Sequence, residues 1–143
     1  MLIIPITTMI QMSSSTDKVP QVILFDNESY LKKLKMDIYN LIEAKLLAND
    51  TLSAIISYSG GCEKHDFTLA AVPNFTNSTT SPHIKLLLAH DNNGEMCKKI
   101  VKENLSFDLS PIKEKYQKDY GLKSGSVMLH LINRSITIKY VFN

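Results

Sequence analysis

The sequence lacks tryptophan, and it has only two cysteines, five glycines and five prolines among its 143 residues. The absence of tryptophan argues weakly against the aromatic stacking platforms of sugar-binding and single-strand-binding proteins, although six tyrosines and five phenylalanines remain. Its 16 lysines and arginines are scattered among 14 acidic residues and form no basic stripe, so we expect no nucleic-acid partner. No apolar run reaches the roughly 18 residues of a membrane-spanning helix, so we expect no transmembrane span.

Recognised catalytic motifs are absent as well. The sequence contains no G-x-S-x-G, no H-E-x-x-H and no glycine loop of the kind that cradles phosphate. It therefore favours a protein that is not an enzyme and needs no cofactor.

The length fits one domain, which we expect to span residues 21–143. Residues 2–10 are mostly apolar, but Pro5 interrupts them and no basic residue precedes them. Residues 11–20 are polar and end at Pro20. We interpret residues 1–20 as a flexible leader or an atypical signal segment.

Alternation of apolar and polar residues dominates from residue 41 onward and predicts β-strands. The expected strands are 41–48, 51–58, 66–72, 83–90, 98–110, 126–132 and 135–142. Residues 111–121 predict a helix, with Ser110 as its cap, Pro111 in its first turn and Gly121 at its end. Residues 28–40 fit a helix or a strand, and we favour a short helix. The fold class predicted is mainly β, an antiparallel β-sandwich of six to seven strands with one or two short helices.

The two cysteines stand near two of the four histidines. If strands 66–72 and 83–90 form a hairpin, the natural register places His65 opposite His90 on one face. Cys62 then lies just before His65, and Cys97 follows His90 after a short turn. We expect these four residues to gather at one end of the sandwich.

Glycines mark the turns at this end. Gly60 and Gly61 allow a sharp turn or a bulge before Cys62, and Gly94 lies in the turn Asp91-Asn92-Asn93-Gly94. That turn resembles a calcium loop only superficially, because position twelve is Lys102 and not glutamate. His83 and His130 are expected at the surface.

Three chemistries fit the cysteines and histidines. The leading hypothesis is a Cys62–Cys97 disulfide, as in many exported β domains. The alternative is a zinc site with Cys62, His65, His90 and Cys97 as ligands, although six residues between His90 and Cys97 is an unusual spacing. The third is a thiol-dependent enzyme in which His65 or His90 activates a Cys62 thiolate.

Three motifs together resemble an uncharacterised family of small bacterial envelope proteins, many with lipoprotein-type signals. The motifs are Y-x-G-G-C-x-x-H-x-F (Tyr58, Gly60, Gly61, Cys62, His65, Phe67), H-D-x-x-G-[DE]-x-C (His90, Asp91, Gly94, Glu95, Cys97) and L-x-F-D-L-[ST]-P-[IL] (Leu105, Phe107, Asp108, Leu109, Ser110, Pro111). The resemblance covers about residues 41–142 and implies an exported β-rich domain, which favours the disulfide. It implies no activity, and the chain lacks the lipobox cysteine of such proteins.

The sequence therefore predicts a non-enzymatic β-sandwich domain, stapled by a Cys62–Cys97 disulfide, that binds a partner or has a structural role in the envelope. Its expected location is secreted, periplasmic or in the cell envelope. A cell-envelope component or another protein is the expected partner.

Overall fold

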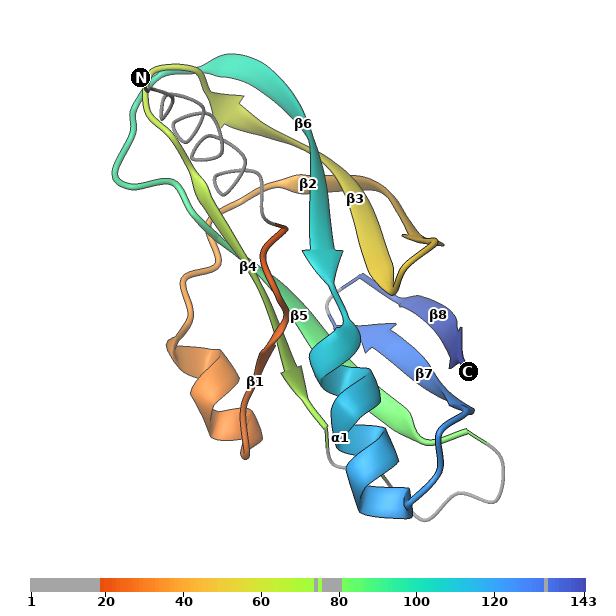
Figure 1. The fold of residues 1–143 in the computed structure, drawn as a ribbon. Helices are drawn as coiled ribbons and strands as arrows, with labels where there is room; N and C mark the ends of the chain where they lie inside the picture. The colour runs from red at the N-terminus through yellow and green to blue at the C-terminus, as the bar shows by residue number, and fades with distance from the viewer. Residues whose placement is uncertain (1–18, 74, 76–80, 133) are drawn as a thin grey trace, which may run out of the picture.

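Two β-sheets share one apolar core in the computed structural model, which describes residues 19–73, 75, 81–132 and 134–143 (Figure 1). Five strands form one sheet in the order β1-β4-β5-β7-β8, and three form the other in the order β2-β3-β6. The elements are β1 Ile23–Leu24, the 3-10 helix η2 Glu28–Lys33, β2 Asn40–Leu47, β3 Thr51–Gly60, β4 Asp66–Val72, β5 His83–Asp91, β6 Lys99–Asp108, α1 Ser110–Tyr120, β7 Gly125–Leu131 and β8 Ile136–Phe142. The predicted β-rich fold class is confirmed. The predicted leader, residues 1–20, falls outside the described residues except for its last two.

The core lies between the two sheets. The small sheet and β7 turn one face of alternating apolar residues inward, as the period-two pattern predicts. β4 and β5 are buried on both faces, because Leu31 of η2 packs with Ala70, Val72 and Leu87 on the side away from this core. The largest fully buried apolar side chains are Leu52, Ile56, Leu69, Ile84, Leu86, Leu88, Leu109, Ile112, Val127, Leu129 and Tyr140. Side chains from both sheets and from α1 are therefore in one cluster.

Two strand pairs are parallel, whereas the sequence predicted antiparallel pairing. β5 pairs with β7 in parallel, and β1 pairs with β4 in parallel. Parallel neighbours need a crossover connection. Here the chain leaves β5, crosses to the other sheet as β6, and returns through α1 to β7. Alternation along each strand reveals the buried face, but it carries no information on this route.

The first described residues connect the two sheets along one side. Val22 N donates to Asp108 O at 3.0 Å, and Asp108 N donates to Pro20 O at 2.8 Å, so this segment lies against the end of β6. Two residues later the chain pairs with β4 as β1. The segment thus belongs to both sheets and fixes one relative to the other.

Residues 28–40 are only partly helical. The 3-10 helix ends at Lys33, and Leu34 has extended backbone angles (φ −79°, ψ 143°). The next residues run beside β5: His90 N donates to Lys35 O at 3.1 Å and Asp37 N donates to His90 O at 2.8 Å. The alternative strand pattern wins here because β5 offers unpaired backbone groups that a longer helix would leave unsatisfied.

α1 confirms the predicted helix to within one residue, but its cap differs. Leu109 and not Ser110 is the N-cap, and it makes no side-chain capping bond. One residue earlier, the side chain of Asp108 accepts a hydrogen bond from Ser110 N at 2.9 Å. Gly121 ends the helix in the left-handed region at φ 68°. Ile112 and Tyr116 are the buried residues of this helix and join the core.

Candidate functional site

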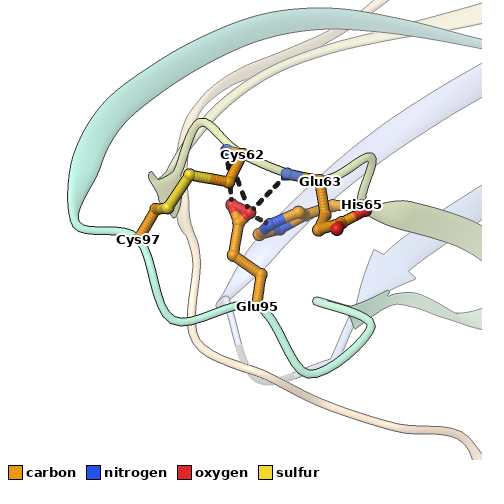
Figure 2. The surroundings of a disulfide bond; sticks show 5 residues. All are labelled: Cys62, Glu63, His65, Glu95 and Cys97. Atoms are coloured by element: carbon orange, nitrogen blue, oxygen red, sulfur yellow. Dashed lines mark hydrogen bonds and ion pairs between the residues drawn. A yellow bond between two sulfur atoms is a disulfide. The ribbon is translucent and has the colours of Figure 1, made fainter.

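A disulfide joins the loop after β3 to the loop before β6 (Figure 2). Cys62 and Cys97 are 35 positions apart in sequence, and their Cα atoms lie 6.0 Å apart. This is the bond that the leading hypothesis expects. It closes the end of the molecule where β3 stops and β6 starts.

Gly60 and Gly61 both matter at this end, for different reasons. Gly61 has φ +105°, a backbone conformation that glycine adopts readily, and it makes the turn before Cys62. A side chain at Gly60 would collide with two others, because an ideal Cβ there would lie 2.6 Å from Glu95 Oε1 and 2.8 Å from His65 Nε2. Gly60 is therefore a point of close approach and not a turn. Gly94, at φ +76°, lies in the turn after β5.

Glu95 links the two disulfide-bonded loops. Its carboxylate accepts hydrogen bonds from Glu63 N at 2.8 Å and from Cys62 N at 3.1 and 3.2 Å (Figure 2). Its Oε1 also lies 3.2 Å from His65 Nε2, an ion-pair distance without hydrogen-bond alignment. The side chain is only 1% exposed. Desolvation raises the pKa of Glu95, but the bonds from Glu63, Cys62 and His65 outweigh it and hold the pKa below the ordinary 4.5.

The two buried histidines form a hydrogen-bonded pair. His65 Nδ1 and His90 Nε2 lie 2.8 Å apart, and His90 Nδ1 lies 3.1 Å from the carbonyl oxygen of Asp37. A carbonyl oxygen only accepts, so His90 Nδ1 carries a proton and donates it. Burial lowers the pKa of His90, which keeps this ring neutral and leaves its Nε2 to accept from His65 Nδ1.

These assignments leave His65 Nε2 facing the Glu95 carboxylate. Because the pKa of Glu95 is lowered, its carboxylate is ionised, and it lies at ion-pair distance from the ring. A series of contacts therefore runs from the Asp37 carbonyl through His90 and His65 to Glu95, and on to the backbone of the disulfide loop.

Aromatic side chains enclose the histidine pair. The Tyr58 ring stacks on His65 with centroids 4.1 Å apart, and the Phe67 ring stacks on His90 at 4.3 Å. Tyr39 meets His90 edge-on at 5.7 Å. As a result His65 is 5% exposed and His90 is 1% exposed. Desolvation and the hydrogen bond to Glu103 raise the pKa of Tyr58, so its hydroxyl is a donor and not a base.

The predicted gathering of Cys62, His65, His90 and Cys97 is what the structure has, but the register behind it was wrong. His90 pairs with Phe67, not with His65. The error is two positions, and a shift of two returns every side chain to the same face. The histidines therefore still face the same side, while His65 itself lies in the loop just before β4.

The zinc and thiol-enzyme alternatives require groups that this arrangement uses elsewhere. The two cysteine sulfurs bond to each other, so neither is a thiolate that could bind zinc or attack a substrate. The facing nitrogens of His65 and His90 bond to each other as well. Among the described residues, no group of three or more His, Cys, Asp or Glu side chains is arranged to hold a metal ion.

One cavity beside the cluster does not expose His65. It has a volume of about 490 Å³ and lies between the start of β4 and the second half of β6. His65 borders it, but the His65 side chain has no exposed surface. This groove is therefore separated from the acid–base groups by the protein itself.

The other two histidines also form a pair. The rings of His83 and His130 stack with centroids 4.7 Å apart, and His83 Nδ1 and His130 Nε2 are hydrogen-bonded. His130 Nδ1 lies 2.8 Å from Thr137 Oγ1 on the neighbouring strand. His83 is exposed and His130 half-buried, so the surface position predicted from sequence holds for His83 and only partly for His130.

Sequence reasoning missed the part played by Glu95. In the sequence Glu95 stands out only as a position of the second family motif, which implies no role for it. The available signal was its place two residues before Cys97, in a turn beside His90. Asp37 gave no side-chain signal, because its backbone carbonyl makes the contact with His90.

Comparisons with known proteins find a similar fold in solved bacterial structures and assign the chain to no family. No protein-family model matches the chain, and no curated protein matches it in sequence. A NigD-like immunity protein from Bacteroides caccae is 19% identical over 85% of this chain, with a TM-score of 0.59. A putative lipoprotein from Bacteroides fragilis is 12% identical over 86% of this chain, with a TM-score of 0.55.

This chain spans 58% of the length of the NigD-like protein and 68% of the putative lipoprotein. At these identities the likeness shows the shared fold alone. It does not test the motifs on which the resemblance to envelope proteins rests. In the part of the chain that the structure describes, no helix is long and apolar enough to cross a bilayer.

Proposed function

We propose that this chain is an exported, non-enzymatic binding module of the bacterial cell envelope, held in shape at one end by its disulfide. The observation that carries the proposal is the Cys62–Cys97 bond, supported from inside by the buried Glu95–His65 pair. Disulfides persist in the periplasm and outside the cell and are rare in the cytosol. The names of the two structural neighbours, an immunity protein and a putative lipoprotein, support the same compartment.

A non-enzymatic role is supported by the enclosure of the polar cluster. His65, His90 and Glu95 are the type of group that catalyses proton transfer, but their side chains face one another and not solvent. A general base needs to lie within hydrogen-bond reach of the substrate proton that it takes. Buried behind Tyr58 and Phe67, these groups instead fix the position of the disulfide loops.

Cell fractionation tests this proposal. The chain, produced from its own gene with an epitope at its C-terminus, is expected in the periplasmic or membrane fraction, and accessible to protease once the outer membrane is opened. A cytosolic marker protein in the same cells controls for leakage. Recovery of the chain in the cytosolic fraction together with that marker would refute the proposed location.

A further inference from the structure

The three most exposed large apolar side chains of the described residues share one end of the molecule. Ile38 is 90% exposed, Met96 86% and Ile100 78%, and the next, Val141, is 59% exposed. Ile38 and Ile100 border one shallow hollow on the outer face of the small sheet. Met96 lies between Glu95, whose side chain is buried, and Cys97 of the disulfide. We name residues 61–64 and 96–102 together with Ile38 the disulfide tip (upper end of Figure 1).

Lysines alternate in sequence with Met96 and Ile100 and also occur in the partner loop of the disulfide. The exposed charged residues of the disulfide tip are Glu63, Lys64, Lys98, Lys99 and Lys102, four positive charges against one negative. Within the described part of the chain, none of the four lysines is in an ion pair. The tip thus combines protruding aliphatic groups with an uncompensated positive charge.

We propose that the disulfide tip docks on an anionic lipid surface. Of the residue types enriched at protein–protein interfaces, the exposed side chains of the tip include only Met96, whereas lysine, which is depleted there, occurs four times. Lysines next to anionic headgroups gain electrostatic attraction, and aliphatic side chains gain by leaving water for the interface. This inference rests on the proposed envelope function and adds to it the chemistry of the surface that is bound.

The disulfide and Glu95 give the tip its form. Met96 and Lys98 flank Cys97, while Lys64 lies two residues after Cys62, so the bond between the sulfurs brings both loops to one end. Glu95 fixes the same loops through Cys62 N and Glu63 N. The buried cluster would therefore hold the lipid-facing residues in place without touching lipid itself.

Vesicle flotation with the purified full-length chain tests the proposal. The probe vesicles contain phosphatidylglycerol and phosphatidylethanolamine in equal parts, and the reference vesicles contain phosphatidylcholine alone. We expect the chain to float with the anionic vesicles only. Binding is expected to vanish at about 1 M salt, where the Debye length falls to about 3 Å.

Two double variants and two matched controls locate the contact. K98Q/K99Q is expected to weaken binding by up to about 25-fold, since each lysine near an anionic surface contributes roughly a factor of five. M96S/I100S is expected to weaken it at least about tenfold, because each methylene left in water costs roughly a factor of four. The controls K118Q/K123Q and L122S/V141S change exposed residues away from the disulfide tip and are expected to leave binding unchanged.

Each result decides the proposal. The proposal is overturned if the unchanged chain does not float, if it binds neutral vesicles equally well, or if the tip and control variants lose binding equally. An acidic protein would then be the expected partner of the disulfide tip. Such a failure leaves the envelope location intact, since fractionation measures that separately. Circular dichroism confirms that each variant is folded before its binding is compared.

Discussion

Removal of the disulfide should destabilise the fold by an amount that chain entropy sets. The bond closes a loop between residues 35 positions apart, and the chain-entropy model gives about 4 kcal/mol for a loop of this length. For a chain of 143 residues, that loss corresponds to a decrease in Tm of about 8–16 °C. The double variant C62S/C97S replaces both sulfurs with groups of similar size and avoids an unpaired thiol.

Urea unfolding, followed by circular dichroism, measures this effect. The unchanged protein with and without reductant is compared with C62S/C97S under the same two conditions. We expect reductant to lower the free energy of unfolding of the unchanged protein to the value of the variant, and to leave the variant unaltered. A difference below about 1 kcal/mol between oxidised protein and variant would refute the account of the bond as a staple, because the loop-closure contribution would then be absent.

Further predictions concern the buried cluster. Gly60→Ala should lower the free energy of unfolding by about 1–3 kcal/mol, because its Cβ would collide with Glu95 and His65. Ser59→Ala, one residue away and exposed, should leave the free energy of unfolding almost unchanged in the same urea assay. Because burial lowers the pKa of His90, this residue binds a proton more readily in the unfolded chain than in the folded one. The free energy of unfolding should therefore fall as the pH drops below 6.5, by at most about 1.4 kcal/mol per pH unit. His90→Gln should remove this dependence, and an unchanged slope in the variant would contradict the assignment of a neutral ring. Because the pKa of Glu95 is lowered below 4.5, its contribution to the free energy of unfolding should be complete above about that pH and be lost as the pH falls further. Glu95→Gln should have a lower free energy of unfolding at neutral pH and should lack this decrease in acid. Acid titration of the two proteins measures both effects. Elemental analysis of the oxidised protein should find no stoichiometric zinc, and one zinc per chain would favour the Cys₂His₂ alternative instead.

An element that has one buried and one exposed face could be predicted from the sequence. Strand 126–132 appears within one residue of its predicted bounds, because one face is buried and alternation records it. The helix at 110–120 was found for a similar reason, with Pro111 and Gly121 at its ends.

Which of these elements pair with each other could not be predicted from the sequence. The parallel pairing of β5 with β7 depends on the crossover through β6, and residues 35–37 become extended because β5 offers them hydrogen bonds. Both are long-range effects that leave no local pattern. The role of Glu95 likewise depends on backbone N–H groups of a loop 32 positions away in sequence.

At the candidate site, too, some features could be predicted from the sequence and others could not. The proximity of Cys62, His65, His90 and Cys97 followed from a hairpin, and it survived a wrong register because the error was even. The series of contacts from the Asp37 carbonyl through His90 and His65 to Glu95 could not be predicted from the sequence, since one end is a backbone oxygen.

Thiol trapping in intact cells tests the central claim most directly. Cells that produce the chain are lysed in acid and treated with a bulky maleimide, with and without prior reduction, and the shift in gel mobility reports free cysteines. The account predicts no shift without reduction and a shift for two thiols after it, in protein recovered from the envelope. Labelling of both Cys62 and Cys97 without reduction would contradict it, since an exported disulfide-stapled domain cannot hold its cysteines as free thiols.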